Sequence, residues 1–159
     1  MSFRVGQGFD FHPLIMGRRL VLGGVEIPYS HGLQGHSDAD VAVHALANAI
    51  LGALGEGDLG SHFPDTDERY SDADSIRLLS LVWARAAALN WRLNNADITI
   101  FAQRPKLAPY LSAMRTRLAA VIRVDESRMN VKASNPEGLG ALGRGEGIAA
   151  AAIVLLEKS

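Results

Sequence analysis

The chain has 159 residues, no cysteine, and 16 Lys and Arg against 17 Asp and Glu, so its formal net charge is −1. This balance gives no basic field, and we expect neither a nucleic-acid partner nor an anionic membrane partner. The lack of cysteine excludes disulfides, thiolate metal sites and a cysteine nucleophile. No apolar run reaches the ~18 residues that cross a membrane, and no signal peptide is visible. We expect one cytoplasmic domain, residues 1–159.

The first third of the chain predicts strands followed by a helix. Residues 4–11 alternate between apolar and other side chains, which predicts a strand. Two short apolar runs, at 20–22 and 25–27, flank a pair of glycines and predict a hairpin. Residues 40–54 carry apolar side chains at helical spacing and precede a glycine, which predicts a helix that ends there.

Helices and strands alternate in the rest of the chain, after one long irregular segment. Residues 56–73 have no period, and segments of this length are usually functional or disordered. Apolar spacing then predicts a helix over 74–91, a strand over 96–102, a helix over 109–122 and a strand over 128–133.

Two assignments near the C-terminal end are less direct. Residues 145–156 are ambiguous, because four consecutive alanines favour a helix whereas the closing Ile-Val-Leu-Leu favours a strand. The glycine-rich run 138–147 superficially resembles a dinucleotide-binding fingerprint, but its spacing is wrong, so we interpret it as a tight loop. The order of elements predicts an α/β or α+β fold in one pair of layers.

A constellation of acids and histidines suggests a metal site. Residues i and i+2 of a strand share a face, so Asp10 and His12 place a carboxylate beside an imidazole. Asp40 begins the predicted helix, and His44 follows one turn later. One Asp with two His is a common zinc ligand set that leaves a position open. The alternatives are ordinary: a lone histidine is usually a surface or packed residue, and Asp40 alone is most simply a helix N-cap.

Three loops carry further polar groups. Residues 102–107 follow a strand and precede a helix, where backbone N–H groups can hold phosphate beside Lys106. A solvated lysine is the ordinary alternative. Residues 132–137 follow another strand and offer a hydroxyl, an amide and a carboxylate. Residues 63–67 are, on their chemistry alone, a turn with an Asx-type cap.

Six segments carry a resemblance that runs along nearly the whole chain. The chain resembles the 2-C-methyl-D-erythritol 2,4-cyclodiphosphate synthase family of the non-mevalonate isoprenoid pathway. Any one segment would be weak evidence, whereas all six in this order are highly specific. They are Gly8–His12, Gly35–Ala45, Gly57–Gly60, Phe63–Asp67, Gln103–Lys106 and Gly143–Gly147.

The resemblance implies an intramolecular phosphoryl transfer. In the family, the 2-phosphate of 4-diphosphocytidyl-2-C-methyl-D-erythritol 2-phosphate attacks the β-phosphorus of the diphosphate. CMP leaves, and an eight-membered cyclic diphosphate forms. By this resemblance Asp10, His12 and His44 hold Zn²⁺, with a substrate phosphate in the open position. Glu137 matches a ligand to a second divalent cation, Mg²⁺ or Mn²⁺, between the α- and β-phosphates.

The resemblance also assigns substrate contacts. His36 and Asn135 are the expected catalytic residues: His36, with Ser37, holds the 2-phosphate, and Asn135 stands where the family has a threonine that donates to the diphosphate. Asp58 matches a contact to the methylerythritol hydroxyls. The covering loop and the cytidine pocket supply the other expected contacts: Leu59, Gly60, Phe63, Pro64, Asp65, Thr66, Asp67, Ala102, Gln103, Arg104, Pro105, Lys106, Leu107, Ala133 and Ser134.

For the architecture, the resemblance implies an α+β fold with helices packed on one face of a sheet. It implies a homotrimer in which the sheets line a threefold axis and each active site lies between neighbouring subunits. It also assigns residues 145–156 to a strand. Arg144 matches an arginine at one end of an apolar axial channel, which holds an isoprenoid diphosphate in some members.

Two positions depart from the family pattern. Where the family has Thr-Thr, then Thr or Asn, then Glu, this chain has Ser134-Asn135-Pro136-Glu137. Asn135 keeps a donor but changes its reach, and Pro136 removes an N–H and restricts Asn135 to extended geometry. We therefore expect activity with an altered rate or affinity. Ala141 replaces a usual Phe beside the axial channel, which puts binding of an isoprenoid diphosphate in doubt.

Two other functions remain open on the sequence. A non-catalytic module on the same scaffold would sense a nucleotide or an isoprenoid diphosphate, although a sensor has no need of two metal sites. A metal-dependent phosphohydrolase would need a water-activating base near the zinc, and no further carboxylate is assigned there.

Overall fold

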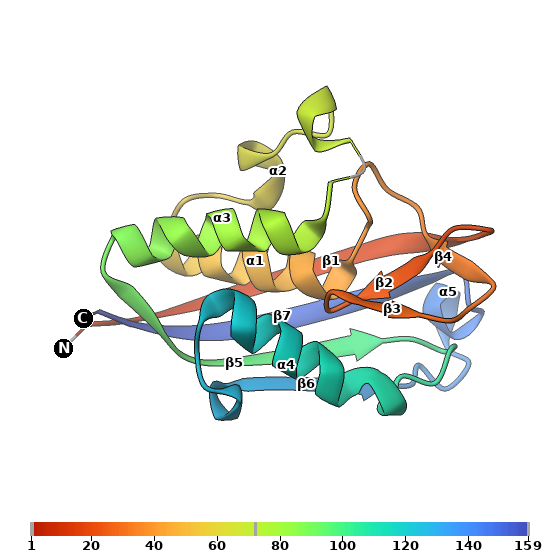
Figure 1. Ribbon diagram of the computed structural model, residues 1–159. Coiled ribbons are helices and arrows are strands. Elements are labelled where there is room, and N and C mark those ends of the chain that lie inside the picture. The colour runs from red at the N-terminus through yellow and green to blue at the C-terminus, as the bar shows by residue number, and fades with distance from the viewer. Residues whose placement is uncertain (1, 72, 159) are drawn as a thin grey trace.

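A five-stranded sheet with strand order β4-β1-β7-β5-β6 forms the centre of the molecule. The computed structural model describes residues 2–71 and 73–158 (Figure 1). β5 and β6 pair in parallel, and the other neighbouring strands are antiparallel. The strands are β1 (Phe3–Met16), β4 (His31–Leu33), β5 (Trp91–Phe101), β6 (Met129–Ser134) and β7 (Gly147–Lys158).

Helices cover one face of this sheet, which confirms the α+β expectation (Figure 1). α1 packs on β1 and β7, α4 packs on β6, and α3 lies against α1. No helix in the described ranges has the length and apolar character needed to cross a membrane. The remaining elements are α1 (Val41–Leu54), α2 (Leu59–His62), α3 (Ser75–Ala88), α4 (Leu111–Ile122), α5 (Gly140–Gly143), the β2 (Leu20–Leu22) and β3 (Val25–Ile27) hairpin, and single 3₁₀ turns at Glu68–Tyr70, Ala108–Tyr110 and Glu126–Arg128.

Glycines on β1 allow α1 to lie very close to the strand. A Cβ atom on Gly6 would lie 1.8 Å from the carbonyl oxygen of Ala49, and one on Gly8 would lie 2.0 Å from that of Ala45. Neither distance is sterically possible, so only glycine permits this approach. The next residues on the same face of β1 are Asp10 and His12, which are thereby brought close to the first turn of α1.

The opposite face of β1 is apolar and uncovered. Val5, Phe9 and Phe11, whose alternation predicted the strand, are 68%, 55% and 71% exposed. Phe9 pairs with Ala151 of β7, and Phe11 pairs with Ala149. The alternation therefore predicted the strand correctly but marks the open face of the sheet rather than the core.

The structure corrects one helix boundary and two predicted loops, one of which is the glycine-rich run 138–147, where residues Gly140–Gly143 form α5. The helix expected over 74–91 ends at Ala88, and Trp91 begins β5. Asn90 between them has a φ of 61°, a left-handed conformation that ends a helix without glycine or proline. The aromatic ring of Trp91 is buried, with Arg4 and Lys158 over it at 5.0 Å and 5.1 Å. The segment predicted to be irregular contains α2 and a 3₁₀ turn. The ambiguous C-terminal segment forms β7.

Candidate active site

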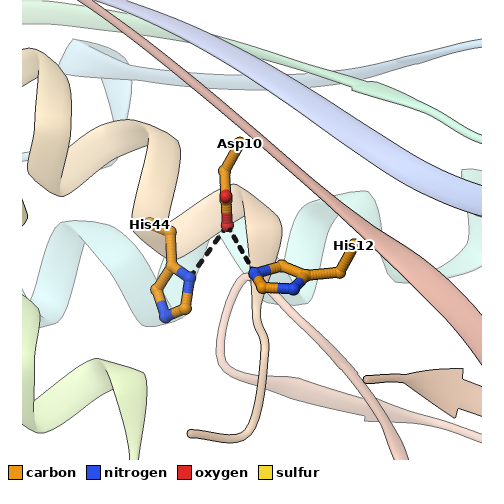
Figure 2. A group of neighbouring side chains, drawn as sticks. All are labelled: Asp10, His12 and His44. Atoms are coloured by element: carbon orange, nitrogen blue, oxygen red, sulfur yellow. Dashed lines mark hydrogen bonds and ion pairs between the residues drawn. The ribbon is translucent and has the colours of Figure 1, made fainter. Parts of the chain in front are cut away.

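Asp10, His12 and His44 converge between β1 and α1 (Figure 2). Asp10 Oδ2 lies 3.1 Å from His12 Nε2 and 2.9 Å from His44 Nδ1. One possible ligand atom from each residue lies within 4.8 Å of the others. The strand-face spacing of the first two residues and the position of His44 in the first turn of α1 explain this convergence. We call these three residues the metal-ligand group.

Asp40, the other acid of the sequence constellation, is a helix cap. Its buried carboxylate accepts hydrogen bonds from the backbone N–H groups of Val43 at 3.1 Å, Gly23 at 2.9 Å and Gly24 at 2.7 Å. Burial raises the pKa of Asp40 to about 6, although these hydrogen bonds oppose the rise. The N-cap interpretation is therefore confirmed, and the same carboxylate ties the β2–β3 hairpin to the start of α1.

The electrostatics of the metal-ligand group favour an ionised carboxylate. Burial by itself raises the pKa of Asp10, but hydrogen bonds with His12 and His44 outweigh it and hold the pKa at about 2. The hydrogen bond with Asp10 raises the pKa of His12. One carboxylate oxygen and two imidazole nitrogens that face a common point are donors that zinc takes, with a fourth position left for a ligand. The donor set therefore fits a divalent metal ion.

The loop between β4 and α1 lies against this group. The guanidinium of Arg18 donates hydrogen bonds to loop carbonyls on both sides of His36. Ser37 Oγ lies 3.3 Å from His44 Nε2. The ring of His36 is exposed, and its Nε2 atom lies 3.4 Å from the carbonyl oxygen of Asp67. Two of the sequence-predicted phosphate contacts are therefore neighbours of the metal-ligand group.

A cavity of about 510 Å³ opens beside the metal-ligand group, and we call it the metal-side cavity. It brings together many of the site residues predicted from the sequence, drawn from β1, α1, α2 and the loops between them. These are Asp10, His12, His36, Ser37, His44, Leu59, Gly60, Phe63, Pro64 and Asp65.

Four lining residues were missed by sequence reasoning: Gly35, Asn48, Tyr70 and Leu78. Asn48 lies one helical turn after His44, so the same spacing argument would have found it. Its Oδ1 accepts the backbone N–H of Leu59 at 2.8 Å, which fixes the start of α2. Tyr70 packs edge-on against Phe63, with ring centroids 5.2 Å apart. No sequence pattern links Tyr70 or Leu78 to this cavity.

Asp58, Thr66 and Asp67 belong to the same covering loop but do not line the metal-side cavity. Asp58 Oδ1 accepts the N–H of Ser61 at 2.8 Å and its hydroxyl at 2.7 Å, and these bonds lower the pKa of Asp58. The side chain of Asp67 caps the 3₁₀ turn and forms an ion pair with Arg69 at 2.6 Å. The Asx-type cap expected in 63–67 is therefore confirmed at Asp67.

The loop after β5, residues 102–107, and the end of β6 with the loop that follows it, residues 133–137, form a separate region that we call the β5–β6 loops. Gln103 and Arg104 line a second cavity of about 410 Å³ together with Arg144. The other predicted residues of these loops line neither this cavity nor the metal-side cavity: Ala102, Pro105, Lys106, Leu107, Ala133, Ser134, Asn135 and Glu137.

Hydrogen bonds within the β5–β6 loops are local. The N–H of Ala102 donates to the carbonyl of Ser134 at 3.2 Å. Asn135 Oδ1 accepts the N–H of Glu137 at 2.7 Å, and both side chains are exposed. These contacts shape the loops, but within the described residues they do not connect them to the metal-ligand group.

The sheet register places the two regions at the same end of the molecule. Asp10 pairs with Ala150 of β7, and Ala150 pairs on its other side with Ile100 of β5. The metal-ligand group and the β5–β6 loops are therefore two strands apart. Among the described residues, the lining of the metal-side cavity does not include Glu137, and the lining of the second cavity includes none of the three predicted zinc ligands.

Comparisons with known proteins agree with this geometry. The YgbB family model matches residues 3–157. The chain is 60% identical over 157 residues to 2-C-methyl-D-erythritol 2,4-cyclodiphosphate synthase from Geobacillus kaustophilus (strain HTA426), with 99% of each chain covered. A 2C-methyl-D-erythritol-2,4-cyclodiphosphate synthase solved in a CDP-bound form has a TM-score of 0.89 and 38% identity, over 97% of this chain and 100% of that chain. The bifunctional IspDF from Campylobacter jejuni has a TM-score of 0.95 and 42% identity over 99% of this chain, which spans 43% of that longer chain.

Proposed function

The chain belongs to the YgbB family, and on this basis we propose that it converts 4-diphosphocytidyl-2-C-methyl-D-erythritol 2-phosphate to 2-C-methyl-D-erythritol 2,4-cyclodiphosphate and CMP. The observation that carries the proposal is the convergence of Asp10, His12 and His44 beside the metal-side cavity. A phosphate-binding metal site of this kind is what the synthase reaction requires.

The chemical difficulty of the reaction is that one anion attacks another. Two unit charges ~4 Å apart repel by ~1 kcal/mol in water and by ~4 kcal/mol at an effective dielectric constant of 20. Ring closure also requires the 2-phosphate and the β-phosphorus to be held in line, which costs orientational entropy. The protein must therefore supply positive charge at the phosphates and walls that fold the substrate.

The metal side of the site supplies part of the positive charge and part of the walls. Zn²⁺ held by Asp10, His12 and His44 would polarise a substrate phosphate at its fourth position. We assign His36 and Ser37, which line the same cavity, to the 2-phosphate as hydrogen-bond donors. Hydrogen bonds to carbonyls on both sides of His36 fix its backbone, so these donors are in place before the substrate arrives.

The covering loop provides walls around the methylerythritol. Phe63 and Pro64, with Tyr70 against the Phe63 ring, present an apolar surface to the metal-side cavity, which favours exclusion of water. We assign Asp58 to a substrate hydroxyl. Both of its hydrogen bonds to Ser61 use Oδ1, which leaves Oδ2 to face the substrate.

We assign the β5–β6 loops to the cytidine and the diphosphate. Mg²⁺ is commonly held by one or two carboxylates together with substrate phosphates, so an exposed Glu137 beside a diphosphate fits such an ion. Asn135 uses its Oδ1 for the N–H of Glu137, which directs its NH₂ group outward as a donor. This arrangement supports a role for Asn135 in place of the usual threonine.

We further propose that the two regions form one active site between subunits of a homotrimer. The open face of the sheet exposes Phe9 and Phe11 by 55% and 71%, and apolar patches of this kind favour burial in an interface. Three sheets around a threefold axis would cover this face and bring the β5–β6 loops of one subunit to the metal-side cavity of its neighbour. Arg144 would then stand near the axial channel, as a candidate contact for an isoprenoid diphosphate.

The experiment that tests this function combines the purified chain with the cytidine diphosphate substrate and Mg²⁺. CMP is followed by chromatography and the phosphorus species by ³¹P NMR. CMP with the cyclic diphosphate is the expected result. CMP with an uncyclised diphosphate would mean that water is the nucleophile and would favour the phosphohydrolase. No CMP from folded, zinc-loaded protein would favour the binding module.

A further inference from the structure

The ring nitrogen of His44 that points away from Asp10 has its own hydrogen-bond partner. His44 Nδ1 lies 2.9 Å from Asp10 Oδ2, whereas Nε2 lies 2.8 Å from the hydroxyl oxygen of Ser75. Ser75 is the first residue of α3 and is fully buried. One helix, α1, therefore carries the proposed ligand, and a second helix, α3, holds the far side of its ring.

Asp38 sets the direction of this hydrogen bond. The hydroxyl of Ser75 donates to Asp38 Oδ1, and the backbone N–H of Ser75 donates to Oδ2 at 3.0 Å. A carboxylate only accepts hydrogen bonds, so the hydroxyl proton points to Asp38 and an oxygen lone pair faces His44. The Nε2 atom of His44 must therefore donate. A neutral imidazole has one N–H, so when an ion takes the place of the proton that Nδ1 shares with Asp10, the lone pair on Nδ1 is the one that faces the ion.

We propose that Ser75 and Asp38 are positioning residues for the metal centre, which hold the His44 ring so that Nδ1 is presented to the ion. The inference rests on the metal-dependent function proposed above and deepens it. A metal-bound histidine usually donates its other N–H to a carboxylate, a carbonyl or a water, and such partners orient the ring. In this chain a serine hydroxyl connects the imidazole to the carboxylate.

Among the described residues, Ser75 is the closer of two hydroxyl groups at His44 Nε2. Ser37 Oγ lies 3.3 Å from Nε2, against 2.8 Å for Ser75, and it also accepts the backbone N–H of Ala39 at 3.2 Å. The start of α3 does not depend on the Ser75 hydroxyl, because the carboxylate of Asp74 caps it by accepting a first-turn N–H at 2.9 Å. Loss of the Ser75 hydroxyl should therefore affect the histidine more than the helix.

The first test measures the zinc affinity of the purified full-length chain by competition with a chromophoric chelator. Ser75→Ala is expected to bind zinc about 10- to 100-fold more weakly than the native chain. Ser80→Ala is the matched control, because the Ser80 hydroxyl lies on the same helix but donates to the carbonyl of Arg77 at 2.7 Å. It should leave the affinity within about twofold. Native affinity in folded Ser75→Ala would overturn the proposal.

A second variant tests the direction of the hydrogen bonds with little change of shape. In Asp38→Asn the amide oxygen can serve only one of the two backbone N–H groups that the native carboxylate accepts, Ser75 at 3.0 Å and Asp40 at 3.2 Å. The shorter bond keeps it on Ser75, so the NH₂ group faces the hydroxyl and turns its proton toward His44. The lone pair needed on Nδ1 is then disfavoured, and zinc affinity should fall at least about tenfold. Asp74→Asn, which keeps a capping side chain, is the control. An unchanged affinity in Asp38→Asn would overturn the assigned direction.

A spectroscopic readout separates positioning from a purely structural role. In zinc-loaded native protein the Nε2-bound proton of His44 should give a slowly exchanging signal in ¹⁵N-edited NMR, and Ser75→Ala should lose it. A signal equally protected in Ser75→Ala would contradict the proposal. If the native chain binds no zinc, the metal-dependent function itself fails. If the native chain binds zinc but neither Ser75→Ala nor Asp38→Asn changes the zinc affinity, only this inference fails.

Discussion

The carboxylate of Asp10 lies within hydrogen-bond reach of His12 and His44, whereas Asn135 and Glu137 are exposed on the loop after β6, three strands from β1 in the sheet order. The first region is held by the packing of α1 on the glycines of β1. In the second region, Ala102 and Leu107 are buried in the core, whereas Asn135 and Glu137 are exposed and joined to each other by a local hydrogen bond. One chain therefore builds the metal side of the proposed site, and the proposed trimer would bring the diphosphate side of a neighbour to it.

The largest expected effect comes from removing the metal side alone. His44→Ala should lose zinc and lower turnover about 1000-fold, because a metal ion contributes several kcal/mol of charge stabilisation and each 1.36 kcal/mol is tenfold in rate. Zinc content and CMP release measure both. His62→Ala is the control, since its Nε2 bonds the carbonyl of Glu56 at 2.8 Å outside the metal-ligand group. Full activity of zinc-free His44→Ala would contradict the assignment.

A substitution on β1 tests whether close helix packing builds the metal side. Gly8→Ala places a Cβ atom 2.0 Å from the carbonyl oxygen of Ala45, so we expect a loss of about 3 kcal/mol in the free energy of unfolding, with weaker zinc binding. Gly52→Ala is the matched control in α1, where the added atom meets nothing closer than 3.6 Å. It should be neutral or stabilising by up to about 1 kcal/mol. Equal stability of the two variants in urea titrations would refute this account.

The acid limb of stability should depend on the metal-ligand group. The pKa of Asp10 is about 2 in the folded chain against an ordinary 3.8, so its ionised form stabilises the metal-free protein above about pH 4. That contribution is lost as the pH falls from about 4 to 2. Between about pH 4 and pH 2, the free energy of unfolding in urea should therefore fall less steeply for Asp10→Asn than for the native chain. Exposed Asp65→Asn should match the native chain, and an identical limb in both variants would argue against the low pKa.

His12 should act in the opposite direction in the same titrations. The hydrogen bond with Asp10 raises the pKa of His12 above its ordinary 6.5. Its protonated form therefore stabilises the metal-free chain fully below pH 6.5, and this contribution is lost as the pH rises through the raised pKa.

The smallest expected effect lies in the β5–β6 loops. Asn135→Thr restores the usual family side chain, and we expect turnover to change by less than about tenfold, because the Asn135 amide already offers a donor. Steady-state CMP release measures the change. An increase of a hundredfold or more would show instead that the native loop is impaired.

Local spacing predicted the metal-ligand group because each step is short: two residues along a strand, then one turn after a helix cap. The same spacing extended by one turn would have added Asn48. Which face of β1 packs on the core was harder to predict. The buried face carries glycines, which give no hydrophobic signal, whereas the phenylalanines lie on the exposed face.

Long-range packing limited the rest of the prediction. Ser75 meets His44 only because α3 lies beside α1, and no spacing in the sequence joins them. Asn90 ends the helix in a left-handed backbone conformation. Asn is one of the residues that end helices in this way, but the apolar spacing was extended past it, so Trp91 was placed in a helix rather than in β5. Residues 135–137 form a loop as predicted, whereas Ser134 is the last residue of β6.

The most direct test of the shared site is subunit complementation. His44→Ala and Glu137→Ala chains would each be inactive alone and are then mixed, unfolded and refolded together at equal concentration. If one subunit supplies the metal-ligand group and its neighbour supplies Glu137, about a quarter of the sites in random trimers contain both intact halves. The account predicts CMP release near that fraction of native activity. Complete inactivity of the mixed trimers would contradict it, because it would place both halves of the site in the same chain.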